Sequence, residues 1–341
     1  MESGMNRWTN RAMVTAALAV AVMSGTAFAQ TAYKVEAKWN IGGDGSWDYL
    51  TVDSAAHRLY IAHQTKVDVV DLTTGKEIGA VIGLTRCHGV VISPDGKTGF
   101  VSDGGANVVV AFDLANFAQT DRIPAGTNPD GMAFEPVTGT LWAFNGTSKN
   151  ATVIDVKTHK VIGTVALPGK PEFPVADGSG TVFVNIEDAN SVVRIDAKSM
   201  KPTATWKLAS CESPSGQAID TAGSRLFAVC DGKKMSVTDA KTGKSLATPS
   251  IGDGPDATAY DARTGLAFSS NEDGTLTIID VKNPGYKVIQ TLPTMDGART
   301  MQMDHSTGKI YLVSAELKKV PGAKRPSAAP GTFTVLVVGR D

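Results

Sequence analysis

The sequence predicts an all-β fold, a seven-bladed β-propeller with four-stranded blades. Three observations predict it. The 341 residues include 35 glycines among many short Val- and Ile-rich runs, and one aromatic residue recurs in each of seven units. Pairs of an apolar residue or Thr followed by Asp also recur, at spacings of 42, 42, 41, 43 and 41 residues, at Asp71, Asp113, Asp155, Asp196, Asp239 and Asp280. Repeats of about 42 residues holding four short strands are typical of propeller blades.

Each unit follows the same plan. A first strand ends in a turn such as "SPDGK" or "DARTG", a second carries the aromatic residue, a third ends in the aspartate, and a fourth follows a turn, as in "KVIGTVALPG". We interpret the aromatic series as core packing between adjacent blades rather than as a cofactor site. Its members are Tyr60, Phe100, Trp142, Phe183, Phe227, Phe268 and Tyr311.

The seventh unit differs from the others and indicates how the ring closes. Its strands are "RTMQMD", "KIYLVSA" and "TFTVLVVG", and a fourth strand is missing. A basic insert rich in Pro, Gly and Ala (317–332) interrupts it, and we expect this insert to be a mobile loop. The segment "YKVEAKWNI" (33–41) has the right length to complete blade seven, so that both chain ends pair in one sheet and no edge stays free.

The first 29 residues have the pattern of a signal peptide. Arg7 and Arg11 flank the start of a short apolar run, and Ala27-Phe28-Ala29 fits a cleavage site. The alternative is an apolar helix that the mature protein keeps. We expect cleavage before Gln30, a single domain over 30–341 and a periplasmic protein. No later segment is long and apolar enough to cross a membrane as a helix.

Composition excludes some function classes. The chain is 42% hydrophobic and 20% charged, with a net charge of -1 and scattered Lys and Arg. Such a chain lacks the basic footprint of a nucleic-acid-binding protein, so we expect no nucleic-acid partner. The sequence contains no Gly-x-Ser-x-Gly elbow, phosphate-binding loop or haem-attachment motif. We expect a monomer.

Several stretches resemble the YVTN β-propeller family, in particular its exported bacterial members. They are "HGVVISPDGKTGFVSD", "NPDGMAFEPVTGTLWAFNG", "ATVIDVKTHKVIGTV" and "GTLTIIDV". The resemblance covers nearly all of the chain after residue 29. It implies a seven-bladed propeller in the periplasm or at the cell surface, but it says little about function because propellers serve many unrelated activities. The cysteines of blade five and the insert of blade seven depart from the family pattern.

The repeat also predicts which side chains meet at the mouth of the central channel. First strands line the axis of a propeller, so equivalent positions before them form a ring. Aligning the blades on their aromatic residues selects Asp48, His88, Asp130, Glu172, Ser215, Asp256 and Arg299. A wider ring comes from the ends of the second strands: His63, Asp103, Asn145, Ile186, Cys230, Asn271 and Ser314, with Glu187 one residue further on.

From this map we predict a ligand-binding site made of the seven ring residues together with His63, Asn145 and Glu187. By the same map His57, His159 and His305 fall in turns on the opposite face, where we expect them exposed.

Two interpretations of the ring stay open. Asp in "NPDG" and "GPDA" can simply accept backbone N–H bonds in a turn, and Arg299 can neutralise its neighbours. Alternatively, carboxylate oxygens with one imidazole suit a divalent ion such as Ca²⁺, Mn²⁺ or Zn²⁺, and the metal candidates are Asp48, His88, Asp130 and Glu172. The candidates for catalysis are His88, Glu172, Asp130 and Arg299, where a carboxyl group beside an imidazole would serve as an acid–base pair.

Three cysteines in an exported protein allow at most one internal disulfide. Cys211 opens blade five and Cys230 ends its second strand, so both should lie near the same rim, and we predict that they are bonded. Cys87 is then left over beside His88. It is either a small buried hydrophobic residue or, with His88, a soft metal ligand.

The leading hypothesis from sequence is a periplasmic propeller that binds a small ligand, a metal ion or a protein partner at the face where the channel opens. The alternative is a metal-assisted hydrolase, lactonase or lyase that acts in the same central pocket. No motif decides between them, so whether the protein is an enzyme stays open at this stage.

Overall fold

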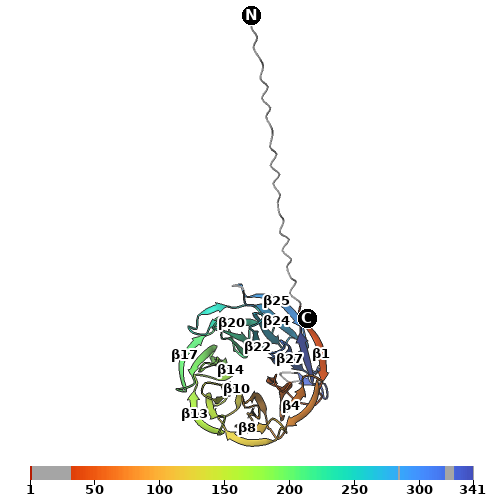
Figure 1. The fold of residues 1–341 in the computed structure, drawn as a ribbon, viewed down its shortest axis with the longest axis vertical. Helices are drawn as coiled ribbons and strands as arrows, with labels where there is room; N and C mark the ends of the chain where they lie inside the picture. The colour runs from red at the N-terminus through yellow and green to blue at the C-terminus, as the bar shows by residue number, and fades with distance from the viewer. Residues whose placement is uncertain (2–31, 283–284, 319–325, 341) are drawn as a thin grey trace. The chain divides into compact units, whose positions relative to one another are not determined.

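Seven four-stranded antiparallel sheets build the chain, as the repeat predicts. The structure is a computed structural model that describes residues 1, 32–282, 285–318 and 326–340. The sheets are arranged as blades around a central axis (Figure 1). The first strands of successive blades contact one another in order around the axis, and the first strand of blade seven returns to that of blade one. The described part of the chain is therefore a closed seven-bladed propeller.

The blades follow the predicted boundaries closely. Blades one to three are β2(Leu50–Asp53), β3(Arg58–His63), β4(Lys66–Asp71), β5(Lys76–Val81); β6(Cys87–Ile92), β7(Thr98–Asp103), β8(Val108–Asp113), β9(Gln119–Pro124); and β10(Pro129–Glu135), β11(Thr140–Asn145), β12(Asn150–Asp155), β13(Lys160–Ala166). Blades four to six are β14(Pro171–Ala176), β15(Thr181–Ile186), β16(Ser191–Asp196), β17(Lys201–Lys207); β18(Gln217–Asp220), β19(Arg225–Cys230), β20(Lys234–Asp239), β21(Ser245–Ala247); and β22(Pro255–Asp261), β23(Leu266–Asn271), β24(Thr275–Asp280), β25(Lys287–Pro293). A 3₁₀ turn, Glu187–Ala189, follows β15.

Blade seven closes the ring with both ends of the chain. Its strands β26(Met301–Met303), β27(Ile310–Ser314), β30(Thr334–Gly339) and β1(Lys34–Asn40) form one sheet, in which β1 pairs with β30. The rings of Trp39 on β1 and Tyr311 on β27 lie 5.9 Å apart. The predicted completion of blade seven by the N-terminal segment is confirmed, and it removes the unpaired edge that an open ring would expose.

The repeated aspartates at the ends of third strands have a local structural role. Asp71 Oδ1 accepts hydrogen bonds from the backbone N–H groups of Thr73 and Thr74 at 3.0 and 2.7 Å, and Asp155 and Asp239 make equivalent bonds to their own turns. Hydrogen bonds from the backbone and side chain of Thr74 lower the pKa of Asp71. The repeat thus fixes the turn into each outer strand through Asx-type chemistry.

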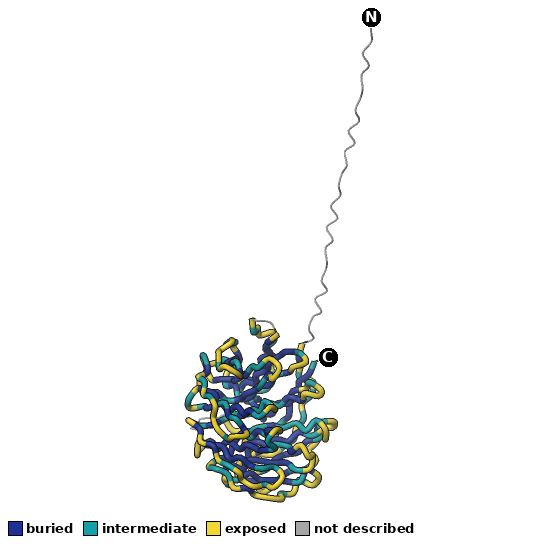
Figure 2. The backbone as a smooth tube through the Cα atoms, turned by 60° about the vertical axis from the view of Figure 1, so that its left-hand side comes forward, coloured by how far each residue is buried: buried dark blue, intermediate teal, exposed yellow. Residues whose placement is uncertain are grey.

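The predicted aromatic series is buried core. All seven members are at most 2% exposed. The described part of the chain contains seven apolar clusters, and each draws its residues from two adjacent blades; one example joins Tyr60 of blade one to Phe112 of blade two, with ring centroids 6.1 Å apart. Figure 2 shows this buried backbone beneath exposed turns. Because every cluster joins two blades, apolar burial holds neighbouring blades together.

The ends of the blade-seven insert, which the sequence predicts as loop, pair as a short hairpin, β28(Leu317–Lys318) with β29(Ser327–Ala328). Residues 319–325 lie outside the described residues. So does the predicted signal peptide, 1–29, apart from Met1.

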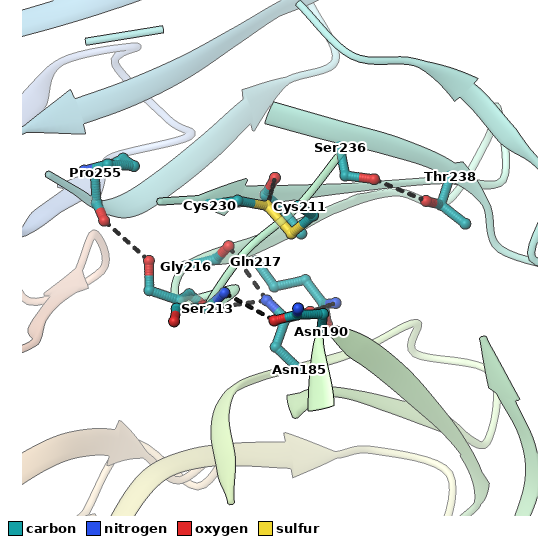
Figure 3. The surroundings of a disulfide bond; sticks show 12 residues. Asn185, Asn190, Cys211, Ser213, Gly216, Gln217, Cys230, Ser236, Thr238 and Pro255 are labelled. Atoms are coloured by element: carbon teal, nitrogen blue, oxygen red, sulfur yellow. Dashed lines mark hydrogen bonds between the residues drawn. A yellow bond between two sulfur atoms is a disulfide. The ribbon is translucent and has the colours of Figure 1, made fainter. Parts of the chain in front are cut away.

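The structure confirms the predicted disulfide. Cys211 and Cys230 are bonded, with their Cα atoms 5.2 Å apart (Figure 3). The bond joins the segment before β18 to the end of β19. Within the described residues, no helix is long and apolar enough to span a membrane.

Candidate functional site

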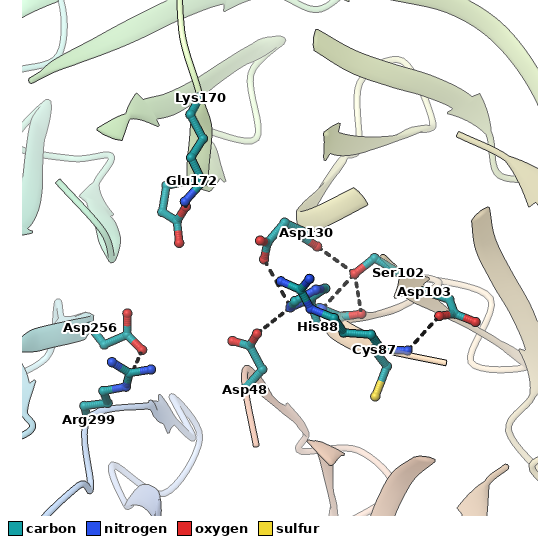
Figure 4. A network of polar contacts seen from close by, with 12 residues as sticks. Asp48, Cys87, His88, Ser102, Asp103, Asp130, Lys170, Glu172, Asp256 and Arg299 are labelled. Carbon is teal, nitrogen blue, oxygen red and sulfur yellow. Dashed lines mark hydrogen bonds and ion pairs between the residues drawn. The ribbon is translucent and has the colours of Figure 1, made fainter. Parts of the chain in front are cut away.

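Bulges at the starts of the inner strands place the ring side chains. In β6 the register shifts between Cys87 and Val90, so His88 and Gly89 together oppose one residue of β7. Equivalent bulges lie in β10, β14 and β22, at Asp130, Glu172 and Asp256. A β-bulge redirects side chains and often lies beside a functional site. Here four bulged strands turn one imidazole and three carboxylates toward a common space at the channel mouth (Figure 4).

Three of the predicted residues form a compact triad. His88 Nδ1 donates to Asp48 Oδ2 at 2.5 Å and lies 3.7 Å from Asp130 Oδ1. One ligand atom from each residue falls within 4.8 Å of the other two. His88 and Asp130 are 5% and 8% exposed. The Asp130 side chain is 12% exposed and faces the His88 imidazole as an ion-pair partner.

The pKa values of His88 and Asp130 are both raised, for different reasons. Burial raises the pKa of Asp130 to about 6, against the opposing charge of His88. Burial alone would lower the pKa of His88, but the hydrogen bond to Asp48 and the charges of Asp130 and Asp48 outweigh it and raise the pKa. The two carboxylates therefore favour the protonated imidazole between them, and a bound cation would take the place of its proton.

The side chain of Glu172 lies in the ring beside a lysine that sequence reasoning missed. Lys170 Nζ lies 3.3 Å from Glu172 Oε2 and is also paired with Glu187. Burial, followed by the charge of Asp130, raises the pKa of Glu172 to about 8. Glu172 therefore exchanges its proton near neutral pH. Lys170 lies two residues before the ring position, a place that the repeat alignment did not sample.

The remaining ring members form two kinds of contact. Arg299 Nε lies 3.3 Å from Asp256 Oδ2, as the neutralising role predicts, and its guanidinium also reaches Glu272 at 3.6 Å. The Ser215 hydroxyl donates to the carbonyl oxygen of Pro255 at 3.0 Å. Ser215 therefore connects two inner strands, whereas the acidic side chains provide the ionisable groups of the ring.

An aromatic pair lies where the ring meets the channel. Tyr49 and Phe173, from opposite sides of the propeller, contact edge to face with centroids 5.1 Å apart. Burial raises the pKa of Tyr49 well above its usual value, and the charges of Asp130, Glu172, Asp48 and Asp256 add to the effect. Sequence reasoning missed this pair, although a signal was present. Both residues directly follow ring positions, whereas the equivalent positions elsewhere are Gly89, Gly131, Gly216, Ala257 and Thr300.

Those glycines are required by close packing of the inner strands. A Cβ on Gly131 would lie 2.8 Å from the carbonyl oxygen of Glu172, and one on Gly216 would lie 2.6 Å from that of Asp256. Small residues therefore let adjacent inner strands approach at these positions.

Residues of the wider ring contact strands and loops of their own blades. Asp103 accepts bonds at 3.0 Å from the backbone N–H groups of Thr85 and Arg86, which positions the loop before His88. Asn145 Nδ2 donates to Thr152 Oγ1 at 3.0 Å. His63 Nδ1 donates to the buried Asp68 at 2.7 Å, and its ring packs 4.3 Å from that of Phe333. These contacts hold the second and third strands and their loops, while Glu187 reaches the ring only through Lys170.

Two further sequence expectations can be compared with the structure. Cys87 is buried, and burial raises the pKa of its thiol to about 12, which matches the small-hydrophobe interpretation. His57 and His305 are exposed as predicted. His159 is only partly exposed, because its ring packs 5.4 Å from that of Phe100 and it pairs with Asp121 at 3.3 Å.

A pocket of about 410 Å³ adjoins the ring at blades one and seven. It lies between the residues that lead into β2, the end of blade six and the β28–β29 hairpin. Trp47 and Arg299 connect it to the ring, because Trp47 directly precedes Asp48 and Arg299 is a ring member. The other lining residues are Gly45, Ser46, Glu272, Gly297, Leu317, Pro326, Ser327 and Ala328.

Fold and site define a propeller with an acidic pocket at one mouth of its channel, a class of scaffold that typically binds a ligand or partner. No family model and no curated protein matches the chain. Two solved propellers are similar in fold. The structure of U3-55K has a TM-score of 0.75 at 11% identity and covers 89% of this chain and 98% of that one. The WD40 repeats of RRP9 have a TM-score of 0.76 at 11% identity and cover 90% and 97%. At this identity the likeness establishes the fold alone.

Proposed function

We propose that the protein binds a cation at the channel mouth, with a divalent metal ion held by Asp48, His88 and Asp130. The observation that carries this proposal is the convergence of one ligand atom each from Asp48, His88 and Asp130 within 4.8 Å of one another, with His88 and Asp130 buried. Mixed oxygen and nitrogen donors suit Zn²⁺ or Mn²⁺, whereas Ca²⁺ prefers six or more oxygens. Glu172 is the fourth metal candidate that the sequence predicts, and its carboxyl group faces the same space as these three residues (Figure 4).

The donor set fits such an ion. Donor atoms around a tetrahedral Zn²⁺ with bonds near 2.1 Å lie about 3.4 Å apart. The separation of 3.7 Å between His88 Nδ1 and Asp130 Oδ1 is close to this value, while the 2.5 Å to Asp48 Oδ2 is a hydrogen bond that an ion would replace. Binding would require the imidazolium to lose a proton. Once bound, the ion would supply Lewis acidity at the edge of the central space.

Calorimetric titration with Zn²⁺, Mn²⁺ and Ca²⁺ tests the proposal. We expect one ion per chain, release of protons into the buffer, and tighter binding at pH 8 than at pH 5.5, because protons compete for the same atoms. His88→Ala should abolish binding. His305→Ala is the matched control, because it removes an exposed turn histidine. Equal binding by both variants would refute the assignment.

One observation also favours the hydrolytic alternative. The pKa of Glu172 near 8 suits proton transfer at neutral pH, and its side chain faces the same space as the triad (Figure 4). We propose that Glu172 would exchange the proton in a metal-assisted ester or lactone hydrolysis. Turnover of simple esters and lactones by the metal-loaded protein, lost in Glu172→Gln with metal affinity retained, would support this role. If the metal-loaded protein turns over none of these esters and lactones, binding stands as the function.

We further propose that the protein is exported to the periplasm and belongs with the YVTN propellers. The pattern of residues 1–29 and the repeat sequences support this, and a Cys211–Cys230 disulfide suits an oxidising compartment. Cell fractionation with N-terminal sequencing of the product tests the export. We expect a mature chain that begins at Gln30; a cytoplasmic chain that retains residues 1–29 would contradict the proposal.

A further inference from the structure

The pocket beside the ring combines apolar walls with charges that are already paired. Trp47 and Leu317 supply apolar surface, and Glu272 and Arg299 supply the charges. Its volume of about 410 Å³ lies in the range of pockets that hold small organic molecules. An ion with no organic part would leave this apolar surface unused.

The charges at the pocket favour a cation over an anion. Arg299 is the only charged donor that lines the pocket among the described residues, and its guanidinium is compensated by both Asp256 and Glu272, at 3.3 and 3.6 Å. An anionic group would therefore meet two carboxylates next to one cation. Beyond Arg299, the ring adds the carboxylates of Asp48 and Asp130 beside His88, and Lys170 is shared between Glu172 and Glu187.

The aromatic pair beneath the ring favours an organic cation in particular. Tyr49 directly follows Asp48, Phe173 directly follows Glu172, and the two rings contact edge to face with centroids 5.1 Å apart. Aromatic faces attract ammonium groups, and the interaction grows when both partners are shielded from water. Carboxylates around an aromatic floor, with an apolar pocket alongside, are complementary to a charged nitrogen attached to a hydrophobic group.

We propose that the ring and the pocket together bind an organic ammonium ion. Its nitrogen lies among the ring carboxylates near Tyr49, and its apolar body lies against Trp47 and Leu317. The inference rests on the proposed cation-binding character of the ring, but it requires no metal ion. It assigns a role to the β28–β29 hairpin, which supplies one wall of the site.

Calorimetry on the folded chain, stripped of metal with a chelator, tests this inference. The probe is 2-phenylethylammonium, compared with 2-phenylethanol, which lacks the charge, and ethylammonium, which lacks the apolar body. We expect the probe to bind at least tenfold more tightly than either comparison compound. Equal affinity for the alcohol would overturn the electrostatic half of the inference, and equal affinity for ethylammonium would overturn the role of the pocket.

Two matched pairs of variants locate the site. Asp48→Asn and Leu317→Ala should each weaken binding of the probe at least fivefold. Asp253→Asn and Leu246→Ala should leave it unchanged, since the Asp253 side chain is 62% exposed and Leu246 is 40% exposed on an outer strand. Thermal unfolding checks that each variant folds, and Glu272→Gln replaces Asp48→Asn if that variant does not. Wild-type affinity in both site variants would overturn the inference.

The metal titration separates this inference from the proposed function. Zn²⁺ binding without ammonium binding would overturn the organic ligand and leave the metal site standing. Ammonium binding without Zn²⁺ binding would support the organic ligand and reject the metal assignment. Failure of both would reject the cation-binding ring altogether.

Discussion

His88 Nδ1 lies 2.5 Å from Asp48 Oδ2, and this contact joins blade two to blade one across the channel mouth. The imidazole is buried, so its charge persists only because carboxylates of both neighbouring blades face it. The contact therefore links the protonation of one histidine to the packing of three blades. It is also the bond that a cation at this site must break.

The Asp48–His88 contact should stabilise the fold in acid more than in base. A histidine whose folded pKa is raised contributes stability that is fully present below its unfolded value of about 6.5 and is lost as pH rises through the folded pKa. We expect Asp48→Asn to lower the free energy of unfolding by about 1.5–3 kcal/mol at pH 5.5, the usual range for a hydrogen bond to a charged group, and by less at pH 9. Urea unfolding at both pH values measures this. A loss that is the same at both would contradict the linkage.

Glu172→Gln should stabilise the protein at alkaline pH. Burial raises the pKa of Glu172 from 4.5 to about 8, so the native state keeps a proton that the unfolded state releases between these values, and stability falls as pH rises through that window. Glutamine cannot ionise, and Lys170 keeps Glu187 as a partner. We expect the variant to gain about 1 kcal/mol or more over the wild type at pH 9 and little at pH 5.

Glu77→Gln is the control for this prediction, because Glu77 lies on an outer strand with its side chain 36% exposed. It should change stability by less than about 0.5 kcal/mol at either pH. If Glu172→Gln instead lowers stability at pH 9, the ion pair between Lys170 and Glu172 outweighs the free-energy cost of burying the Glu172 carboxylate. The assignment of a raised pKa to Glu172 would then be wrong.

The fold could be predicted from sequence because local chemistry repeats. In blades one to six the third strand ends in an aspartate that bonds its own turn, and every second strand carries a buried aromatic residue at the same position. These signals act within one blade, so a spacing of about 42 residues reveals them without knowledge of the ring. The closing strand was predictable for a different reason, since blade seven lacked one element that the N-terminal segment could supply.

The candidate site was predictable only in outline. Alignment on the aromatic residues found the positions that converge, but the bulges at Asp130 and Glu172 decide where these side chains point. Lys170 escaped notice because it lies two residues before a ring position, and Tyr49 escaped notice because its partner Phe173 comes from another blade. The pocket depends on the β28–β29 hairpin, whose short strands carry no periodic signal.

Removing the disulfide should destabilise the propeller without changing its fold. The bond closes a loop with a sequence separation of 19, for which the chain-entropy model gives about 3 kcal/mol. We expect Cys211→Ser with Cys230→Ser to lower the free energy of unfolding by roughly that amount. A reductant should have the same effect on the wild type and no effect on the double variant.

Cys87 provides an internal check on the same samples. Because its thiol is buried with a pKa of about 12, it should react with a thiol reagent only after unfolding. One reactive thiol per unfolded, unreduced chain would agree with the bonded pair, whereas three would contradict it.

Closure of the ring by β1 should be measurable at one glycine. Gly75, in the turn after β4, has a φ of +69°, and a Cβ there would lie 2.5 Å from the Trp39 ring on β1. Gly139 has a φ of +67°, but nothing lies within 4 Å of its Cβ position. Alanine at Gly139 therefore costs only the backbone strain, about 1 kcal/mol. Alanine at Gly75 should cost more, because it also displaces Trp39.

A double-mutant cycle isolates the contribution of the closing strand. In a Trp39→Ala background the extra cost of Gly75→Ala should disappear, leaving the value seen for Gly139→Ala. Trp39→Ala itself should lower the free energy of unfolding by about 2 kcal/mol, below the range for a fully buried tryptophan because its side chain is only partly buried. Additive costs in the cycle would mean that β1 does not pack against the turn at Gly75.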